Sequence, residues 1–149
     1  MAATCYRDEL DSFFEQNPFI HISTCGGSEI GCFSTLAVLE ETTKPGFLDH
    51  VNEMAEFYRQ NLSDLKSRFP HLLIEIRQKG LMMGLKFPVE KISMGMCKLL
   101  YDNGVFVVYS GNDTTVIQFL PPLIISRKEA EFTIETIEKS LAMMNEMIQ

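Results

Sequence analysis

The chain has 149 residues, of which 46% are hydrophobic, and its formal net charge is −7. This is enough apolar material for a packed core without disulfides, and the acidic balance argues against nucleic acid or an anionic membrane as a partner, because both bind basic surfaces. No apolar run reaches the roughly 20 residues of a membrane span, and the first residues lack the apolar centre of a signal peptide. The four cysteines form no CxxC pair and the three histidines are scattered, so we expect a cytoplasmic protein without a metal site.

Two helices are expected in the first third of the chain. Apolar residues at helical spacing predict one helix from Arg7 to about Glu15, and Pro18 stops it because the residue before a proline disfavours the helical region. A short extended segment, Phe19 to Ile22, follows. The second helix is predicted from Glu29 to about Thr43, before the turn signal Lys44-Pro45-Gly46. Its expected inner face carries Cys32, Leu36 and Leu39.

The segment that leads into the second helix has the composition of an anion-binding loop. It reads Ser23-Thr24-Cys25-Gly26-Gly27-Ser28. The glycines allow backbone conformations that other residues avoid, and Ser28 is a good N-cap. The free N–H groups of the first helical turn would face an anion in the loop, and Thr24 adds a hydroxyl donor. A phosphate fits this pattern, although many helices begin after Gly-Gly-Ser and merely cap themselves.

The rest of the chain alternates between helices and short strands. Apolar residues every three or four positions predict a long helix from Phe47 to Phe69. Two dense apolar runs, 72–77 and 80–87, predict a hairpin joined by Gln78-Lys79. A helix from Val89 to Asp102 is expected to end in a left-handed cap at Gly104.

A second antiparallel strand pair and a closing helix complete the prediction. The strands, 106–109 and 116–119, flank the polar turn 110–113. Ser126 and Glu129 form a capping box that starts a helix reaching to about Ile148. The predicted fold class is α+β: from about residue 47 to the end, a small and mostly antiparallel sheet is covered on one face by helices.

Several motifs together resemble the class III aminotransferases, which are pyridoxal-phosphate enzymes that include ornithine, acetylornithine, 4-aminobutyrate and putrescine aminotransferases. Residues 1–10 resemble the family segment just after the cofactor-binding lysine, and 119–123, Phe-Leu-Pro-Pro-Leu, resemble its last strand. Between them lie His21-x-Ser23-Thr24-x-Gly26-Gly27, followed by Cys32, and Arg77-Gln78-Lys79-Gly80-Leu81-Met82-Met83-Gly84. Because these motifs occur in the family order across the whole chain, their combination is more specific than any one of them.

The resemblance implies a cofactor and a domain organisation. It implies that Ser23, Thr24, Gly26 and Gly27 bind the phosphate of pyridoxal 5'-phosphate, with the threonine acting across the dimer interface in the partner subunit's active site. It further implies that residues 1–45 are the end of a large cofactor domain with an interdomain helix. Residues 46–149 would then be the C-terminal small domain of a fold-type I enzyme. A homo-oligomer, most simply a dimer, is expected.

The same resemblance implies that the catalytic residues lie outside this chain. In the family the large domain supplies the Schiff-base lysine, an aspartate at the pyridine nitrogen and an aromatic ring stacked on the cofactor. None of the eight lysines here has a context that would desolvate it. We therefore expect a C-terminal fragment of an enzyme that transfers an amino group from an amine or ω-amino acid to a 2-oxo acid. The fragment alone should be inactive, without catalytic residues and without bound cofactor.

One position departs from the family in a way that bears on the substrate. The last strand of the family carries an arginine that pairs with a substrate carboxylate, and this chain has Gln118 there. A neutral amide cannot form the bidentate, charge-assisted pair. Gln118 is thus a candidate substrate-binding residue. It suits an amine donor without an α-carboxylate, or an enzyme whose carboxylate-binding residue lies outside this chain.

Two other functions are compatible with the sequence to different degrees. The chain would alternatively be a stand-alone dimerisation or ligand-binding module derived from such a small domain. A hydrolase built on His21 with Ser23 or Ser28 is disfavoured, because no carboxylate is placed to orient the histidine. If the chain is a fragment of such an aminotransferase, we expect the apolar side chains near the N-terminus that would pack on the large domain to face water unless the chain self-associates. These are Phe13, Phe14, Phe19 and Ile20.

Overall fold

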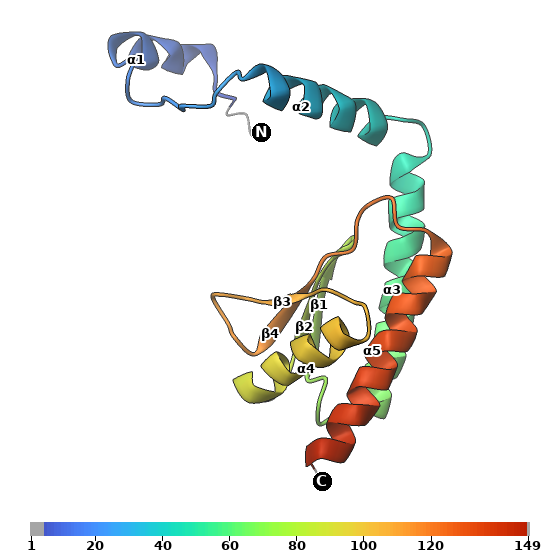
Figure 1. Cartoon of the computed structure of the whole chain (residues 1–149). Coiled ribbons are helices and arrows are strands. Elements are labelled where there is room, and N and C mark those ends of the chain that lie inside the picture. The colour runs from blue at the N-terminus through green and yellow to red at the C-terminus, as the bar shows by residue number, and fades with distance from the viewer. Residues whose placement is uncertain (1–4, 149) are drawn as a thin grey trace. The chain divides into compact units, whose positions relative to one another are not determined.

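The computed structural model describes residues 5–148, and the chain divides into two compact units between Phe47 and Leu48 (Figure 1). Residues 1–4, part of the first family-like motif, lie outside the described residues, as does Gln149. The N-terminal unit has no buried residue between positions 5 and 47, whereas the C-terminal unit has an extensive core. None of the helices between residues 5 and 148 is both long and apolar enough to cross a membrane.

The N-terminal unit contains the two predicted helical regions. The first is a 3-10 turn, Asp8–Leu10, continued by helix α1, Asp11–Gln16, and the second is α2, Glu29–Thr42. The expected extended segment at 19–22 is wrong, because the chain there forms turns and bends. Pro18 favours a turn position, and the Ile20 amide donates to the Asn17 carbonyl at 3.0 Å.

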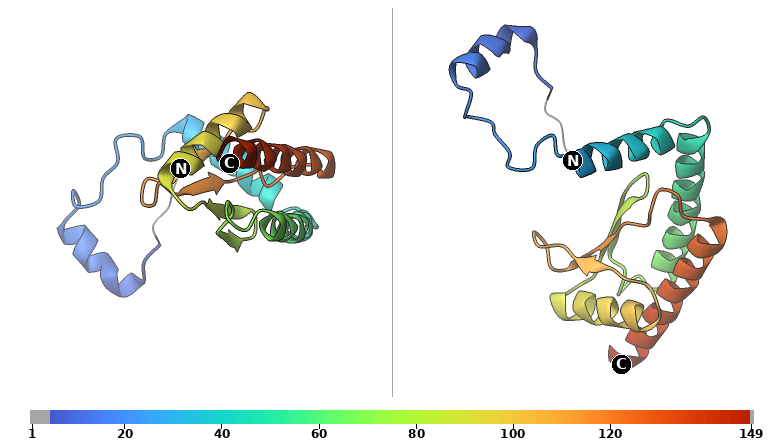
Figure 2. Two further views of the ribbon diagram at one scale, coloured as in Figure 1. Left: turned by 90° about the horizontal axis from the view of Figure 1, so that it is seen from below. Right: turned by 45° about the horizontal axis from the view of Figure 1, so that its top comes forward.

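The C-terminal unit has the predicted α+β architecture. Its helices are α3, Phe47–Arg68, α4, Glu90–Asp102, and α5, Arg127–Ile148. Its strands are β1, Glu75–Lys79, β2, Met82–Lys86, β3, Val108–Tyr109, and β4, Val116–Phe119. All neighbouring strands are antiparallel, in the order β1-β2-β4-β3. The helices gather on one side of the sheet (Figure 2), so the sheet has an inner face against them and an outer face.

The β1–β2 hairpin differs from the prediction in the position of its turn. Gln78 and Lys79 belong to β1, and the turn is Gly80-Leu81. Two-residue hairpin turns require a positive φ, and Gly80 supplies it with φ +58°. The Gln78 side-chain amide donates to the carbonyls of Ala55 at 2.8 Å and Gly80 at 3.0 Å. Gln78 therefore ties the hairpin to α3 instead of forming its tip.

Tyr58 of α3 lies at the centre of the core, with no exposed surface. Its ring packs edge-on against the ring of Phe119, with the ring centroids 5.3 Å apart. Its hydroxyl and the Thr133 hydroxyl share a hydrogen bond of 2.8 Å. One side chain thus joins α3 to both the sheet and α5. The other largest fully buried side chains are Met54, Leu62, Leu65, Leu72, Leu73, Leu85, Phe87, Met96, Leu100, Ile117 and Ile137.

The predicted caps at the C-terminus of α4 and at the N-terminus of α5 are confirmed. Gly104 has φ +92°, and the amides of Gly104 and Val105 donate to the carbonyls of Tyr101 and Leu100 at 3.0 and 2.8 Å. This is the paired bonding of a Schellman cap. At α5 the Ser126 amide donates to Glu129 Oε2 at 2.8 Å, and the Glu129 amide donates to Ser126 Oγ at 3.3 Å. The Ser126 hydroxyl, which donates to Glu129 Oε2 at 2.6 Å, and then the Ser126 amide lower the pKa of Glu129.

Candidate functional site

The loop before α2 is a tight turn whose own backbone uses part of its hydrogen-bonding capacity. The Gly26 amide donates to the Ser23 carbonyl at 3.1 Å, and the Ser28 amide donates to the Cys25 carbonyl at 3.2 Å. Gly27 has φ +69°, which favours glycine at this position. The amides of Gly26 and Ser28 are thus engaged inside the loop and are not available to an anion.

The hydrogen-bond donors that remain available to an anion are the Thr24 hydroxyl and the first amides of α2. Ser28 occupies the N-cap position with φ −60° and ψ 138°, but its side chain makes no capping hydrogen bond, contrary to the expectation of a serine cap. The first amides of a helix have no partner within it and carry its positive dipole end. A phosphate needs hydroxyl and amide donors of this kind, so the loop fits one part of a phosphate site.

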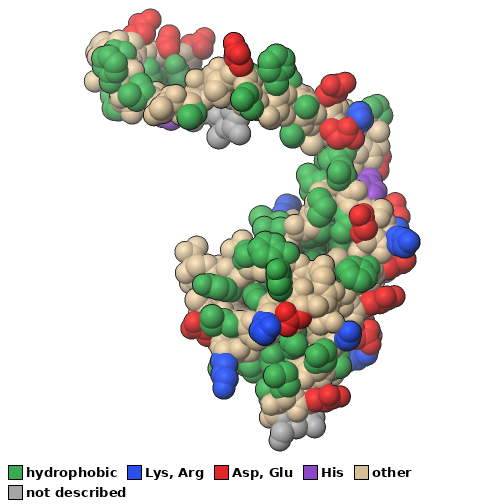
Figure 3. All heavy atoms as spheres, viewed as in Figure 1, with side chains coloured by type: hydrophobic (Ala, Val, Ile, Leu, Met, Phe, Trp, Pro, Cys, Tyr) green, Lys and Arg blue, Asp and Glu red, His purple; other side chains and the backbone are tan. Residues whose placement is uncertain are grey.

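Helix α2 is apolar on all sides, unlike the one-faced helix that the sequence suggested. Ile30 and Val38 lie on the side of the helix opposite Leu36 and Leu39, and these four side chains and that of Phe33 are all exposed. Ile30 is 82% exposed and Phe33 73%. Figure 3 shows apolar side chains spread along the N-terminal unit. Because a helix that is apolar all round is typical of a protein interior, α2 has the composition of a helix with neighbours on every side.

The apolar surface expected near the N-terminus is largely confirmed. Phe13, Phe19 and Ile20 are exposed, with Phe19 at 81%. Phe14 is the exception, since it is half-buried beneath the ring of Tyr6, with the ring centroids 4.5 Å apart.

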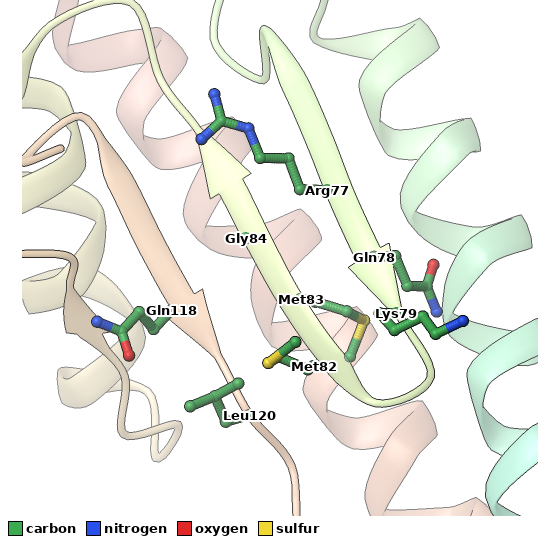
Figure 4. Close-up of a pocket in the computed structure, with 8 residues that line it drawn as sticks. All are labelled: Arg77, Gln78, Lys79, Met82, Met83, Gly84, Gln118 and Leu120. Carbon is green, nitrogen blue, oxygen red and sulfur yellow. The ribbon is translucent and has the colours of Figure 1, made fainter. Parts of the chain in front are cut away.

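Gln118 lies in the C-terminal unit, on the outer face of the sheet. It is half-buried in β4, directly opposite Gly84 of β2, and Gly84 in turn lies opposite Arg77 of β1. These residues line a shallow trough of about 440 Å³ (Figure 4), together with Met82 and Leu120. The sequence indicated Gln118 alone. Strand alternation was the available signal for Arg77 and Gly84, but it needs the strand order before it brings them together.

An ion pair fixes the loop between β3 and β4 beside this face. Lys86 Nζ donates to Asp113 Oδ2 at 2.8 Å, and the Thr115 amide donates to Asp113 Oδ1 at 3.1 Å. The hydroxyl of Ser93 in α4 donates to the Thr114 carbonyl. The hydrogen bond from Lys86, followed by that from the Thr115 hydroxyl, lowers the pKa of Asp113 from 3.8 to about 2. The loop is therefore held to both β2 and α4.

The depressed pKa of Asp113 predicts a pH-dependent contribution to stability. A carboxyl whose pKa is lower in the folded state stabilises that state above its unfolded pKa and loses the effect as the pH falls through the folded value. The window for Asp113 runs from about 3.8 down to about 2. We expect the difference in free energy of unfolding between wild type and Asp113→Asn to shrink across this window, measured by urea unfolding at stepped pH. A difference that stays constant down to pH 2 would contradict the assignment.

Comparison with known proteins agrees with these features of fold and sequence. The family model described as "Aminotransferase class-III" matches residues 1–141. The chain belongs to the class III aminotransferases. An uncharacterized aminotransferase of Archaeoglobus fulgidus is 42% identical over 137 residues, covering 92% of this chain and 32% of the relative. An acetylornithine aminotransferase of Caldanaerobacter subterraneus is 33% identical over 84% of this chain, and a putrescine aminotransferase of Pectobacterium atrosepticum is 27% identical over 97%.

Solved structures show the same fold for this class III aminotransferase chain. The structure of a transaminase with L-alanine superposes with a TM-score of 0.80 at 16% identity, covering 95% of this chain and 35% of the transaminase chain. The ornithine aminotransferase of Toxoplasma gondii, whose structure has pyridoxal phosphate at partial occupancy in the active site, gives a TM-score of 0.75 at 24% identity over 87% of this chain. The chain spans about a third of the length of the curated relatives that it matches.

Proposed function

We propose that this chain works as part of a pyridoxal-phosphate-dependent aminotransferase that transfers an amino group from an amine or ω-amino acid to a 2-oxo acid. The family match over residues 1–141 carries this proposal. The names of two relatives, putrescine and acetylornithine aminotransferase, support an amino group remote from an α-carboxylate as the reacting group. When bound, pyridoxal phosphate supplies the electron sink for the exchange of the amino group.

The residues of this chain would bind and orient the reactants. Thr24 and the first amides of α2 would donate hydrogen bonds to the cofactor phosphate, with Ser23, Gly26 and Gly27 holding the turn that presents them. Gln118 would contact the substrate on the outer face of the sheet. Its amide offers directional hydrogen bonds but no charge, which favours a donor amine without an α-carboxylate beside it.

The surroundings of the lysines support the proposal that the isolated chain is inactive. A lysine that attacks a carbonyl must be neutral, and burial or a neighbouring cation is what lowers its pKa enough. Among residues 5–148 no lysine is buried: Lys66 and Lys86 are half-buried and the others are exposed. Lys86 is also committed to Asp113. None of these lysines has the surroundings of a catalytic one.

Turnover by the isolated chain is the experiment that tests this proposal. The 149-residue protein is incubated with pyridoxal phosphate, a diamine donor and 2-oxoglutarate, and glutamate formation is followed. We expect no glutamate above a cofactor-only control, and no visible absorbance from cofactor retained after gel filtration. Turnover accompanied by retained cofactor would overturn the inactivity proposal, because one of the eight lysines would then have to serve.

We also propose that the apolar surface of the N-terminal unit pairs with a second copy of the chain. Light scattering should give at least a dimer, and Phe33→Asp should shift it toward the monomer. Phe106→Asp is the matched control, because Phe106 is 77% exposed in the C-terminal unit and Phe33 is 73% exposed in α2. A wild-type chain that stays monomeric at all concentrations, or equal effects of the two variants, would contradict the pairing through α2.

A further inference from the structure

A row of residues crosses the outer face of the sheet in register. Arg77 lies opposite Gly84, Gly84 opposite Gln118, and Gln118 opposite Val108, so the row spans all four strands. Side chains of directly opposed residues project to the same face of a sheet. Figure 4 looks onto this face, with Arg77 and Gln118 on either side of Gly84 and the helices behind the strands. A guanidinium and an amide therefore border the same trough.

Gly84 keeps the floor of the trough open. A Cβ at this position would lie 3.2 Å from Val116 Cγ1 and 3.8 Å from Arg77 Cβ, so part of the need for glycine comes from packing against Val116. Glycine within a strand costs stability and marks a place where another group approaches the backbone closely. Met82 and Leu120 add apolar walls. The trough has a volume of about 440 Å³ and presents a cation, an amide and apolar side chains to a small ligand.

The charge of this face is opposite to that of the chain as a whole. The net charge of the chain is −7, yet the outer face of the β1–β2 hairpin carries Arg77, Lys79 and Lys86. Two carboxylates, Glu75 and Asp113, accompany these three cations. A local excess of cations on an acidic protein attracts small anions and raises their concentration at the face.

The guanidinium of Arg77 already holds a carboxylate in the geometry that a ligand would use. Its Nε and one terminal nitrogen donate to the two oxygens of Glu75, both at 2.9 Å. The pair is about half exposed, and exposed pairs contribute little to stability, so an incoming carboxylate can replace Glu75 at small cost. Lys86 lies directly opposite Glu75, so the displaced side chain keeps a cation beside it.

We propose that Arg77, assisted by the amide of Gln118, binds a carboxylate of the 2-oxo acid substrate in this trough. The proposal rests on the aminotransferase function proposed above. It gives carboxylate recognition to a guanidinium two strands away from Gln118, at the other edge of the glycine floor. Arg77 then supplies the fork of donors that the neutral side chain at position 118 cannot supply.

Binding to the ¹⁵N-labelled chain, followed by NMR, tests the proposal with 2-oxoglutarate as the probe. We expect saturable shifts of the Gly84 backbone amide and of the Gln118 side-chain amide. Arg77→Gln should weaken binding about tenfold or more, and Arg77→Lys should weaken it less, because the charge remains but the fork is lost. Lys98→Gln is the control, since it removes an exposed cation of α4 that does not line the trough, and it should change the affinity less than twofold. The dimethyl ester of 2-oxoglutarate should not bind.

Two outcomes would overturn the assignment. One is the absence of saturable binding to the wild-type chain. The other is an equal loss of affinity in Arg77→Gln and Lys98→Gln, which would indicate general attraction to cations on the protein surface. Failure of the proposed function is a separate result, because it is read from amino-group transfer and not from binding: 2-oxoglutarate would then still bind through Arg77 in a protein without transaminase activity.

Discussion

Replacing Tyr58 by alanine is expected to lower the free energy of unfolding of the C-terminal unit by about 3–5 kcal/mol. The side chain has no exposed surface, packs edge-on against Phe119 and shares a hydrogen bond with Thr133. Its removal leaves a cavity where α3, the sheet and α5 meet, and these elements cannot collapse into the space independently. Urea unfolding of the full chain, followed by circular dichroism, measures the effect.

Two variants separate the contributions to this loss. Tyr58→Phe keeps the ring and removes only the hydroxyl, so it should cost about 1 kcal/mol. Tyr101→Ala is the control for loss of an aromatic side chain, because Tyr101 is exposed on α4, and it should change stability by roughly 0.5 kcal/mol or less. If Tyr101→Ala were as costly as Tyr58→Ala, the core assigned here would be wrong.

Replacing Thr24 by alanine is expected to weaken binding of pyridoxal phosphate by roughly tenfold to a hundredfold, because a hydrogen bond to a charged group contributes about 1.5–3 kcal/mol. The measurement requires a protein with a complete cofactor site. We suggest a chimera in which this chain replaces the matching 32% of the Archaeoglobus fulgidus aminotransferase, to which it is 42% identical. Titration of the apo-chimera with cofactor, followed by visible absorbance, gives the affinity.

Two control variants test whether the loss of cofactor affinity in Thr24→Ala comes from the Thr24 hydroxyl. Thr24→Ser keeps the hydroxyl and should bind the cofactor almost as tightly as the unaltered chimera. Thr35→Ala removes a hydroxyl that donates to the Gly31 carbonyl within α2, at 2.8 Å, and should leave cofactor affinity unchanged. Equal affinities for Thr24→Ala and Thr24→Ser would show that the Thr24 hydroxyl does not contact the phosphate.

The features that the sequence predicted well are those that depend on near neighbours in the chain. The capping box at Ser126 and Glu129 and the left-handed cap at Gly104 each involve a few consecutive residues, and both occur as predicted. The hairpin turn was displaced from 78–79 to 80–81, because the apolar runs do not reveal which residue must take a positive φ. In the same way, Pro18 was recognised as a helix stop, but the turn after it was not.

The candidate sites were predictable only in part. The loop at 23–28 was identified from its residues, but the bonds that occupy two of its amides depend on the turn geometry. Gln118 was identified from a family motif, whereas its neighbours Gly84 and Arg77 are 34 and 41 positions earlier in the sequence. They become neighbours only through the strand order β1-β2-β4-β3. Long-range register of this kind is not encoded in local spacing.

Amino-group transfer by the chimera tests whether this chain can complete a working aminotransferase. The chimera and the unaltered Archaeoglobus protein are assayed side by side with pyridoxal phosphate, a set of amine and ω-amino acid donors, and 2-oxoglutarate. We predict that the chimera retains cofactor and forms glutamate, whereas the isolated 149-residue chain does neither. A folded chimera that retains cofactor but transfers no amino group, beside an active parent, would contradict the assignment of this chain to a working aminotransferase.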